Sequence, residues 1–356
     1  MFLKMEEQID LSILEPITLQ DFIGQNHAKE ILREHLKYSS ATGSSLSHIL
    51  LKGPPGIGKS TLAKILANEM NVNIYTTTGV EMNDIDKLKG AIKKIKNKEM
   101  LFIDEIHNIN PRLSEFLYGI MTDSKFTELE LDEKKKRYIH AVHILPRFTI
   151  IGATTEPGKL KQPFLDRFEQ IELYYYSDEE LVDIINRGSD LLRMIKLSNA
   201  AAFSIASKSS GTPRRANRLL QNVKIHTFNK TLDWKTEEER VIHWITEDIV
   251  LSTCKLYGID VMGLYDLDRR LLKYLADVGG TAGLENIAEV IGTDKLYVKR
   301  DVEPLLIRIK FIKRTNRGRE LLDAGWKYLG IDPPRKEYKG TRRRKIVDGP
   351  IYDLRI

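Results

Sequence analysis

Apolar residues in the first half of the chain follow two alternating patterns. Short apolar runs, typical of buried strands, occupy residues 48–51, 73–76, 100–104 and 148–153. Between these runs, apolar residues recur at every third or fourth position, as in helices that bury one face; examples are Ile85, Leu88, Ile92 and Ile95. Strands and helices alternate in this way to about residue 172, which predicts a parallel α/β sheet.

Residues 125–147 depart from this alternation. Their short alternating runs flank a charged turn, Asp132 to Arg137, so we predict a β-hairpin inserted in the sheet domain. The helix before it is predicted to begin at Pro111, with Asn110 as its cap, because proline is favoured at the first helical position.

The second half of the chain has the pattern of two further units. Ser177 and Glu180 have the spacing of a capping box and open a stretch that we expect to be all-helical to about Leu256. Residues 258–331 predict three short helices followed by two strands joined by a turn at 315–318, the order of a winged helix. Within it, residues 293–303 predict a recognition helix whose length Pro304 limits.

That helix carries Lys295, Tyr297, Lys299 and Arg300. Basic side chains on an exposed face contact phosphates with little base readout, although a solvated charged face would have the same composition. We therefore predict a sheet domain (1–172) containing the hairpin (125–147), a helical domain (173–256), a winged helix (257–331) and a basic tail (332–356).

Composition narrows the class of protein. Of the 356 residues, 42% are hydrophobic and 30% charged, and no run approaches the roughly 18 apolar residues of a membrane span. The acidic N-terminus is unlike a secretory signal, and the single cysteine, Cys254, can close no internal disulfide. We therefore expect a soluble, cytoplasmic protein. The tail holds eight basic and four acidic residues, which fits either a solvated end or a phosphate-attracting arm.

A phosphate-binding loop follows the first predicted strand. Residues 53–60, with the sequence GPPGIGKS, have the Walker A spacing and precede a predicted helix. Glycines let backbone N–H groups wrap the phosphates, Lys59 supplies a cation, and Ser60 offers a hydroxyl to Mg²⁺. The predicted ATP-binding residues of this loop are Gly53, Gly56, Gly58, Lys59, Ser60 and Thr61.

The strand at 100–104 ends in two carboxylates, as a Walker B segment does. We predict that Asp104 holds Mg²⁺ and that Glu105 orients and deprotonates the attacking water. Because successive strand residues point to opposite faces, these two roles require the strand to end there. His107 follows, either as a support for this site or as a structural histidine.

Three further segments have the character of a hydrolytic site. Thr154 and Thr155 end a predicted strand, where a hydroxyl can contact the γ-phosphate, although threonines also cap strands. Arg167 follows Asp166 at a predicted sheet edge, as a finger for a neighbouring subunit's nucleotide or as a partner in a surface salt bridge. Arg214 lies in the first turn of a helix that Thr212 is predicted to cap.

With these motifs in order, residues 14–331 resemble the RuvB family of AAA+ motors, which drive branch migration of Holliday junctions. The Walker motifs match any AAA+ protein. The segments that narrow the match lie in the predicted DNA-binding unit: LDRRLL at 267–272 and RTNRGR at 314–319.

The resemblance implies an AAA+ sheet domain, a helical lid and a winged helix, assembled as hexameric rings around duplex DNA. It implies that Thr155 is sensor 1, Arg167 the trans-acting finger and Arg214 sensor 2. The hairpin at 125–147 corresponds to the family's docking site for RuvA. The residues that would surround the adenosine are Leu14, Ile23, Tyr176 and Arg214, and those that would contact DNA are Arg314, Arg317 and Arg319.

The chain departs from the family pattern in several places. Glu15 and Leu165 stand where arginines are usual, Asn316 replaces a proline in the wing turn, and the hairpin tip at 132–137 is more charged. Two rival functions also remain: a nucleotide-switched DNA-binding protein such as a replication initiator, and a clamp-loader-like scaffold. A clamp loader would normally lack the winged helix.

Overall fold

The computed structural model describes residues 11–82, 84–132, 137–192, 195–230 and 243–334. They belong to two compact units, residues 1–266 and 267–356. The hairpin tip at 133–136 and the basic tail beyond residue 334 lie outside the described residues.

A five-stranded parallel sheet is the centre of the first unit, with strand order β2-β3-β6-β1-β7. Its strands alternate with helices along the chain, as predicted. The strands are β1 (Ile49–Lys52), β2 (Ile74–Thr78), β3 (Met100–Asp104), β6 (Thr149–Thr154) and β7 (Glu169–Glu172).

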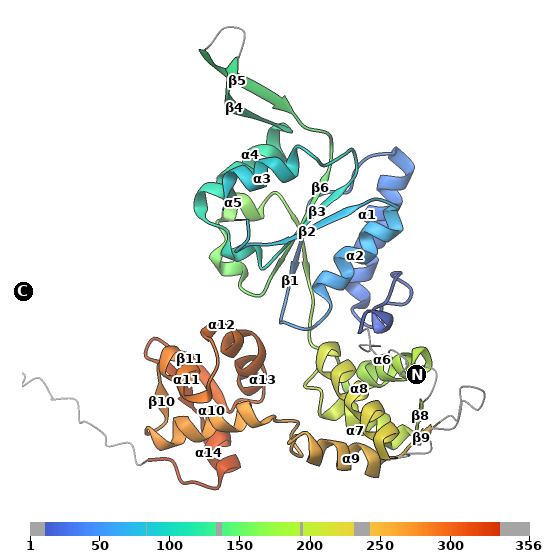
Figure 1. Cartoon of the computed structure of the whole chain (residues 1–356), viewed down its shortest axis with the longest axis vertical. Helices are drawn as coiled ribbons and strands as arrows, with labels where there is room; N and C mark the ends of the chain where they lie inside the picture. Colours follow the sequence, from blue (N-terminus) through green and yellow to red (C-terminus); the bar gives the residue numbers. More distant parts are fainter. Residues whose placement is uncertain (1–10, 83, 133–136, 193–194, 231–242, 335–356) are drawn as a thin grey trace, which may run out of the picture. The chain divides into compact units, whose positions relative to one another are not determined.

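The three central strands, β1, β3 and β6, are buried on both faces, and neighbouring strand residues point to opposite sides of the sheet. Ile49 and Leu51 belong to one core cluster, whereas Leu50 between them belongs to the other. Helices α1 (Asn26–Thr42) and α2 (Lys59–Met70) cover the first side. Helices α3 (Ile85–Ile92), α4 (Pro111–Asp123) and α5 (Gln162–Leu165) cover the second (Figure 1). The predicted cap is present, since the Asn110 side chain accepts a hydrogen bond from the backbone N–H of Leu113.

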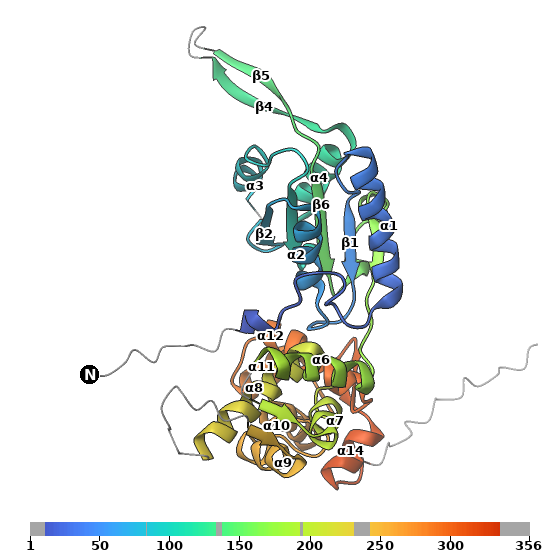
Figure 2. The same ribbon diagram turned by 90° about the vertical axis from the view of Figure 1, so that its right-hand side faces the viewer.

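The predicted hairpin insertion is confirmed. Strands β4 (Lys125–Asp132) and β5 (Arg137–Ile144) pair in antiparallel register from Lys125 opposite Ile144 to Asp132 opposite Arg137. Its base packs on the sheet domain, where Phe126 is buried and stacks on His143 at 4.9 Å between ring centroids. The rest projects away from the sheet (Figure 2).

The helical domain begins at the predicted capping box, in which Ser177 and Glu180 exchange side-chain and backbone hydrogen bonds. Its helices are α6 (Asp178–Leu191), α7 (Asn199–Ser207), α8 (Pro213–Lys230) and α9 (Glu247–Leu256). The all-helical prediction is wrong in one respect: β8 (Ile195–Leu197) pairs in parallel with β9 (His243–Ile245). Strands of three residues are too short to have a recognisable period, and their partners are distant in sequence.

The second unit has the predicted winged-helix order, with additions. Its helices are α10 (Asp266–Asp277), α11 (Leu284–Ile291), α12 (Lys295–Tyr297), α13 (Glu303–Arg308) and α14 (Asp323–Leu329). The wing strands β11 (Ile312–Thr315) and β12 (Gly318–Leu321) are joined by a third, β10 (Thr281–Ala282). No helix in the described part of the chain has the length and apolar character to cross a membrane.

The expectation that Pro304 ends the recognition helix is wrong. A π-helical turn, Val298–Val302, follows α12, and Pro304 then lies in the first turn of α13. A proline in a first turn interrupts no intrahelical hydrogen bond, because that N–H has no partner within the helix. The helical segment therefore continues through the proline to Arg308.

Candidate nucleotide and DNA sites

The phosphate-binding loop connects β1 to α2 and depends on glycines for its shape. Gly53, Gly56 and Gly58 have φ values of +146°, +76° and +100°, in a region that side chains disfavour. A Cβ on Gly53 would overlap the carbonyl oxygen of Leu173, and one on Gly58 would lie 3.0 Å from the ring of Phe22. The backbone path that the Walker A spacing predicts is therefore available only to glycine.

Lys59 begins α2 and its side chain is held inside this loop. Its Nζ donates to the carbonyl oxygens of Gly53 and Pro54 at 2.8 and 2.7 Å. Burial lowers the pKa of Lys59 from 10.5 to about 8, and the charge of Arg214 adds to this effect, while Glu105 and Asp104 act in the opposite direction. Burial thus disfavours the charged ammonium, and the negative charge of a bound phosphate would stabilise it again.

We expect the affinity for MgATP to fall as the pH rises above about 8. A phosphate favours the protonated amine, so above the pKa of the unliganded protein binding requires proton uptake and weakens by up to about tenfold per pH unit. Titration with a fluorescent nucleotide at a series of pH values measures this dependence. The matched control is Lys59→Arg, whose guanidinium stays charged and should bind without an inflection near pH 8; the same inflection in both proteins would contradict Lys59 as its source.

Hard oxygen donors meet beside the loop. The hydroxyl of Ser60 donates to a carboxylate oxygen of Asp104 across 3.4 Å, and Thr61 follows in the same helical turn. A hydroxyl and a carboxylate are the protein ligands that Mg²⁺ accepts beside nucleotide phosphates. The donor set therefore fits a magnesium ion held by Ser60 and Asp104.

Glu105 leaves the strand direction as its proposed role requires. β3 ends at Asp104, and Glu105 has the left-handed conformation, with φ of 47°. Its Oε2 accepts a hydrogen bond from the Thr155 hydroxyl at 3.1 Å and lies 3.2 Å from Nδ1 of His107. That ring nitrogen also lies 3.0 Å from Oγ1 of Thr154. The ends of β3 and β6 thus hold the carboxylate from two sides.

His107 is therefore part of this network, and the local sequence alone left its role open. Its side chain is only 5% exposed, so its contact with Glu105 is largely shielded from water. One feature of the sequence could have indicated this role: His107 follows Glu105 by two positions, just after the end of β3.

The helical domain contributes the other side of the loop. The backbone N–H of Arg214 donates to the carbonyl oxygen of Gly56 at 3.3 Å, and the Tyr176 hydroxyl donates to that of Ile57 at 3.2 Å. Burial raises the pKa of Tyr176, so this hydroxyl stays a donor. Leu14 is buried in the same core, and Ile23 is half-buried directly after the buried Phe22. Thr212, the predicted cap of α8, donates its hydroxyl to the carbonyl oxygen of Ser209.

Arg167 lies on the surface immediately before the edge strand β7. Its guanidinium donates to the Tyr118 hydroxyl at 2.9 Å and lies 4.8 Å from the centroid of that ring. The alternative partner, Asp166, instead accepts a hydrogen bond from Gln162 at 2.6 Å. Sequence reasoning missed Tyr118, because α4 and the Arg167 segment are far apart in the chain.

The arginines of the wing differ in how they are held. The fully buried Glu303 accepts hydrogen bonds from Arg314 at 2.9 Å and from Arg319 at 2.5 and 3.1 Å. Arg319 is only 11% exposed, Arg314 is 46% exposed, and Arg317 is exposed in the turn between β11 and β12. Of the three arginines predicted to contact DNA, Arg314 and Arg317 are therefore the more accessible, and Arg319 is the most firmly held.

We expect Glu303→Gln to lower the free energy of unfolding by roughly 3 kcal/mol, because it leaves the buried guanidinium of Arg319 without its counter-charge. Urea unfolding of the full chain measures the loss. Glu320→Gln is the matched control: Glu320 pairs with exposed Lys313 at 3.1 Å, and such a pair is worth less than about 1 kcal/mol. Equal losses in the two variants would contradict a structural role for Glu303.

Comparisons with known proteins cover these units in turn. Residues 14–173 match the model of the Holliday junction DNA helicase RuvB P-loop domain, residues 176–239 the RuvB AAA lid domain, and residues 261–330 the RuvB C-terminal winged helix domain. The chain belongs to the RuvB family.

Curated RuvB proteins match along nearly the whole chain. The Holliday junction branch migration complex subunit RuvB of Kosmotoga olearia is 38% identical over 331 residues, covering 92% of each chain. The corresponding subunit of Methanoregula boonei is 39% identical, covering 93% of this chain and 96% of the relative. The solved structure of the Thermotoga maritima RuvB Holliday junction branch migration motor superposes with a TM-score of 0.75 at 34% identity, covering 90% of this chain and all of that one. The chain is accordingly an AAA+ ATPase with a sheet domain, a lid and a winged helix.

The departures from the usual RuvB pattern are accommodated locally. Glu15, in place of an arginine, pairs with Lys64 of α2 at 2.8 Å. Leu165, in place of another, packs partly buried against the second core cluster. Asn316 lies in the wing turn, where Thr315 accepts a hydrogen bond from the N–H of Arg317.

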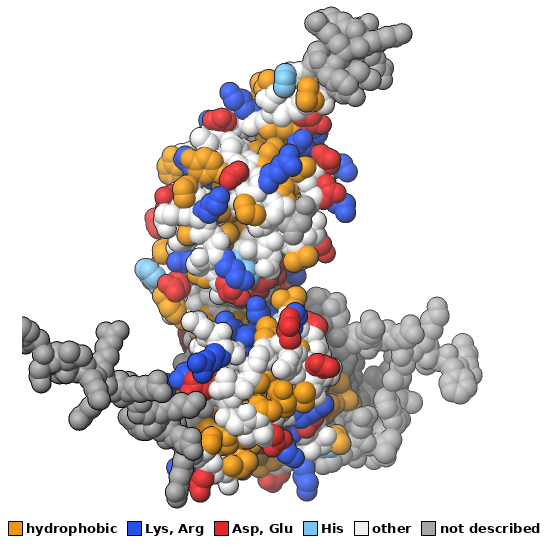
Figure 3. Space-filling model, turned by 90° about the vertical axis from the view of Figure 1, so that its left-hand side faces the viewer, with side chains coloured by type: hydrophobic (Ala, Val, Ile, Leu, Met, Phe, Trp, Pro, Cys, Tyr) orange, Lys and Arg blue, Asp and Glu red, His pale blue; other side chains and the backbone are white. Residues whose placement is uncertain are grey.

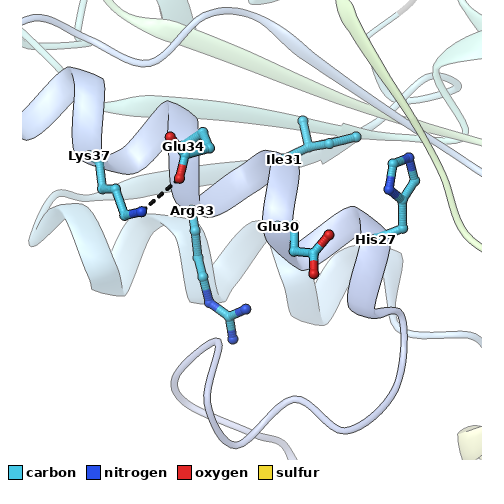
Figure 4. A pocket seen from close by; sticks show the side chains of 6 residues that line it. All are labelled: His27, Glu30, Ile31, Arg33, Glu34 and Lys37. Carbon is cyan, nitrogen blue, oxygen red and sulfur yellow. Dashed lines mark hydrogen bonds and ion pairs between the residues drawn. The ribbon is translucent and has the colours of Figure 1, made fainter.

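A shallow hollow along α1 is separate from the nucleotide site and from the wing arginines. Its lining residues all belong to α1, and its Lys37–Glu34 pair, 2.6 Å apart, is 71% exposed on both sides (Figure 4). An ion pair this exposed is screened by water, so we interpret the hollow as a solvated helix face.

Proposed function

We propose that the chain is the ATP-driven motor of Holliday junction branch migration in recombination and repair, working as a hexameric ring on duplex DNA. One observation carries this proposal: a single chain of the RuvB family contains both a nucleotide site suited to hydrolysis and a winged helix with accessible arginines. Because its proposed substrate is DNA, we also propose a cytoplasmic location.

In this proposal the sheet domain binds and hydrolyses ATP. Lys59 binds the terminal phosphates, and Ser60 with Asp104 would hold Mg²⁺, which supplies charge neutralisation at the phosphates when bound. Glu105 orients and deprotonates the attacking water. Thr155 and Arg214 contact the phosphates from the sheet and the lid, and Leu14, Ile23 and Tyr176 surround the adenosine.

Arg167 would act on the nucleotide of the neighbouring subunit. Its exposed position on an edge of the sheet domain, away from the chain's own phosphate-binding loop, supports this role. The contact with Tyr118 restricts the orientation of the Arg167 guanidinium. The side chain would therefore lose little conformational entropy on binding a neighbouring subunit's nucleotide.

DNA contact is assigned to the wing residues Arg314, Arg317 and Arg319. Arg314 and Arg317 are the more exposed of the three, and Arg319 shares the partner of Arg314, the Glu303 carboxylate. Basic and acidic side chains are interspersed over the face seen in Figure 3, so contact through a few placed arginines suits this surface better than a broad positive patch. Contacts of this kind are insensitive to sequence, as movement along arbitrary DNA requires.

The hairpin is the proposed docking site for a RuvA-like partner. One face of the described ladder carries three exposed apolar side chains, Leu129, Val142 and Ile144. The opposite face is occupied by contacts with the sheet domain, including the ion pair between Glu128 and Lys93 at 3.1 Å. An exposed apolar strand face is typical of a protein contact surface.

A branch-migration assay on a synthetic four-way junction, with and without a purified RuvA protein, tests the function. We expect ATP-dependent migration that requires the partner. A chain that stays monomeric with MgATP and duplex, and whose turnover ignores DNA, would contradict the proposal. Sequence-specific binding without DNA-stimulated turnover would favour the replication-initiator alternative instead.

A further inference from the structure

The segment between the lid and the winged helix, residues 258–265, is a folded turn. Gly258 ends α9 in the left-handed conformation, and Ile259, which donates its N–H to the carbonyl oxygen of Cys254, is buried in the lid core. The Asp260 carboxylate accepts hydrogen bonds from the N–H groups of Met262 and Leu264 at 2.9 and 2.8 Å. The connection is therefore internally fixed.

This turn is also tied to the lid at its far end. Gly263 has φ of +77°, and a Cβ there would lie 2.5 Å from the carbonyl oxygen of Lys208 at the end of α7. Leu264 is fully buried. The backbone thus approaches α7 as closely as only a glycine allows, and the next residue anchors the turn.

Tyr265 ends the turn beneath two arginines of α8. The guanidinium carbons of Arg215 and Arg218 lie 5.3 and 5.7 Å from the centroid of its ring. Residues three apart on a helix share a face, so both cations reach the same ring, and cation–π attraction holds a ring in such a position. Tyr265 also packs against the lid core.

The same helix contacts the nucleotide loop. Arg214, whose N–H donates to Gly56 in the phosphate-binding loop, immediately precedes Arg215. At the other end, α10 of the winged helix begins at Asp266, directly after Tyr265. A continuous series of contacts thus runs from the phosphate loop through the first two turns of α8 to Tyr265, the residue that directly precedes α10.

We propose that Tyr265, clamped by Arg215 and Arg218, is the positioning residue that transmits movement of the lid to the winged helix. The inference rests on the proposed motor function. A flexible linker would absorb a rotation of α8, whereas a turn fixed at Ile259, Leu264 and Tyr265 carries it to the start of α10. Tyr265 touches neither nucleotide nor DNA in this scheme, so it governs the coupling between hydrolysis and movement.

The test uses the full chain with Tyr265→Ala, together with Tyr265→Phe, which keeps the ring. For the alanine variant we expect DNA-stimulated ATP turnover and DNA affinity within about twofold of the parent, but junctions migrated per ATP reduced by about tenfold, the loss that follows when one coupling contact disappears. Tyr265→Phe and a control at an exposed lid tyrosine, Tyr257→Ala, should couple normally. Normal coupling in Tyr265→Ala would overturn the proposal.

A second measurement keeps the inference independent of branch migration. Amide hydrogen exchange at the start of α10 should change between ADP and a non-hydrolysable ATP analogue in the parent, and the change should be lost in Tyr265→Ala and in Arg215→Ala/Arg218→Ala. Loss of this response supports the clamp even if the parent migrates no junctions, an outcome that would refute only the proposed function. A response that survives in both variants refutes the clamp.

Discussion

Replacing Glu105 with glutamine should leave ATP binding within about twofold of the parent and reduce hydrolysis by about 10²–10⁴-fold, the usual contribution of a general base. Glutamine keeps the shape of the side chain and its acceptor oxygen for Thr155 and His107, but it cannot take a proton from water. Branch migration should disappear with hydrolysis. Phosphate release and nucleotide binding, measured on the same preparation, separate the two effects.

The control for this variant is Glu115→Gln, an exposed carboxylate on α4 that pairs with Lys161 at 3.2 Å. It loses the same charge and should hydrolyse ATP normally. Turnover close to the parent value in Glu105→Gln would remove Glu105 from its role and leave Asp104 as the remaining acidic candidate at this end of β3.

Arg167→Ala should reduce hydrolysis by about 10³–10⁵-fold, the contribution of an arginine that neutralises charge at the transition state. The defect should be complemented in mixtures with a Lys59→Ala chain. The Lys59→Ala subunit still offers its arginine to a neighbour, and the Arg167→Ala subunit still has an intact phosphate-binding loop. Steady-state turnover at varied mixing ratios measures the complementation, which should pass through a maximum.

Arg112→Ala is the matched control, because Arg112 is likewise exposed and lies on α4, the helix that carries Tyr118. It should not affect turnover. If no mixture of Arg167→Ala and Lys59→Ala exceeded the activity of either chain alone, Arg167 could not be acting on a neighbouring subunit, and its contact with Tyr118 would be structural.

Several features of this protein were determined by neighbouring residues alone. The order of strands and helices follows from the period of apolar positions, and the shape of the phosphate-binding loop from three glycines at positive φ. The capping box at Ser177 and the presence of a hairpin insertion also follow from short segments. In each case the physical cause acts over a few residues, so the sequence is sufficient to reveal it.

The tertiary structure decided the features that join distant segments. It placed Glu303 under Arg319, paired β8 with β9, and brought Arg167 onto Tyr118. It also set the continuation of the helix through Pro304 after a π-helical turn, against the local expectation. These outcomes depend on which groups lie side by side once the core has packed. A buried charge or an aromatic ring pairs with the group that is near it in space, whatever their separation along the chain.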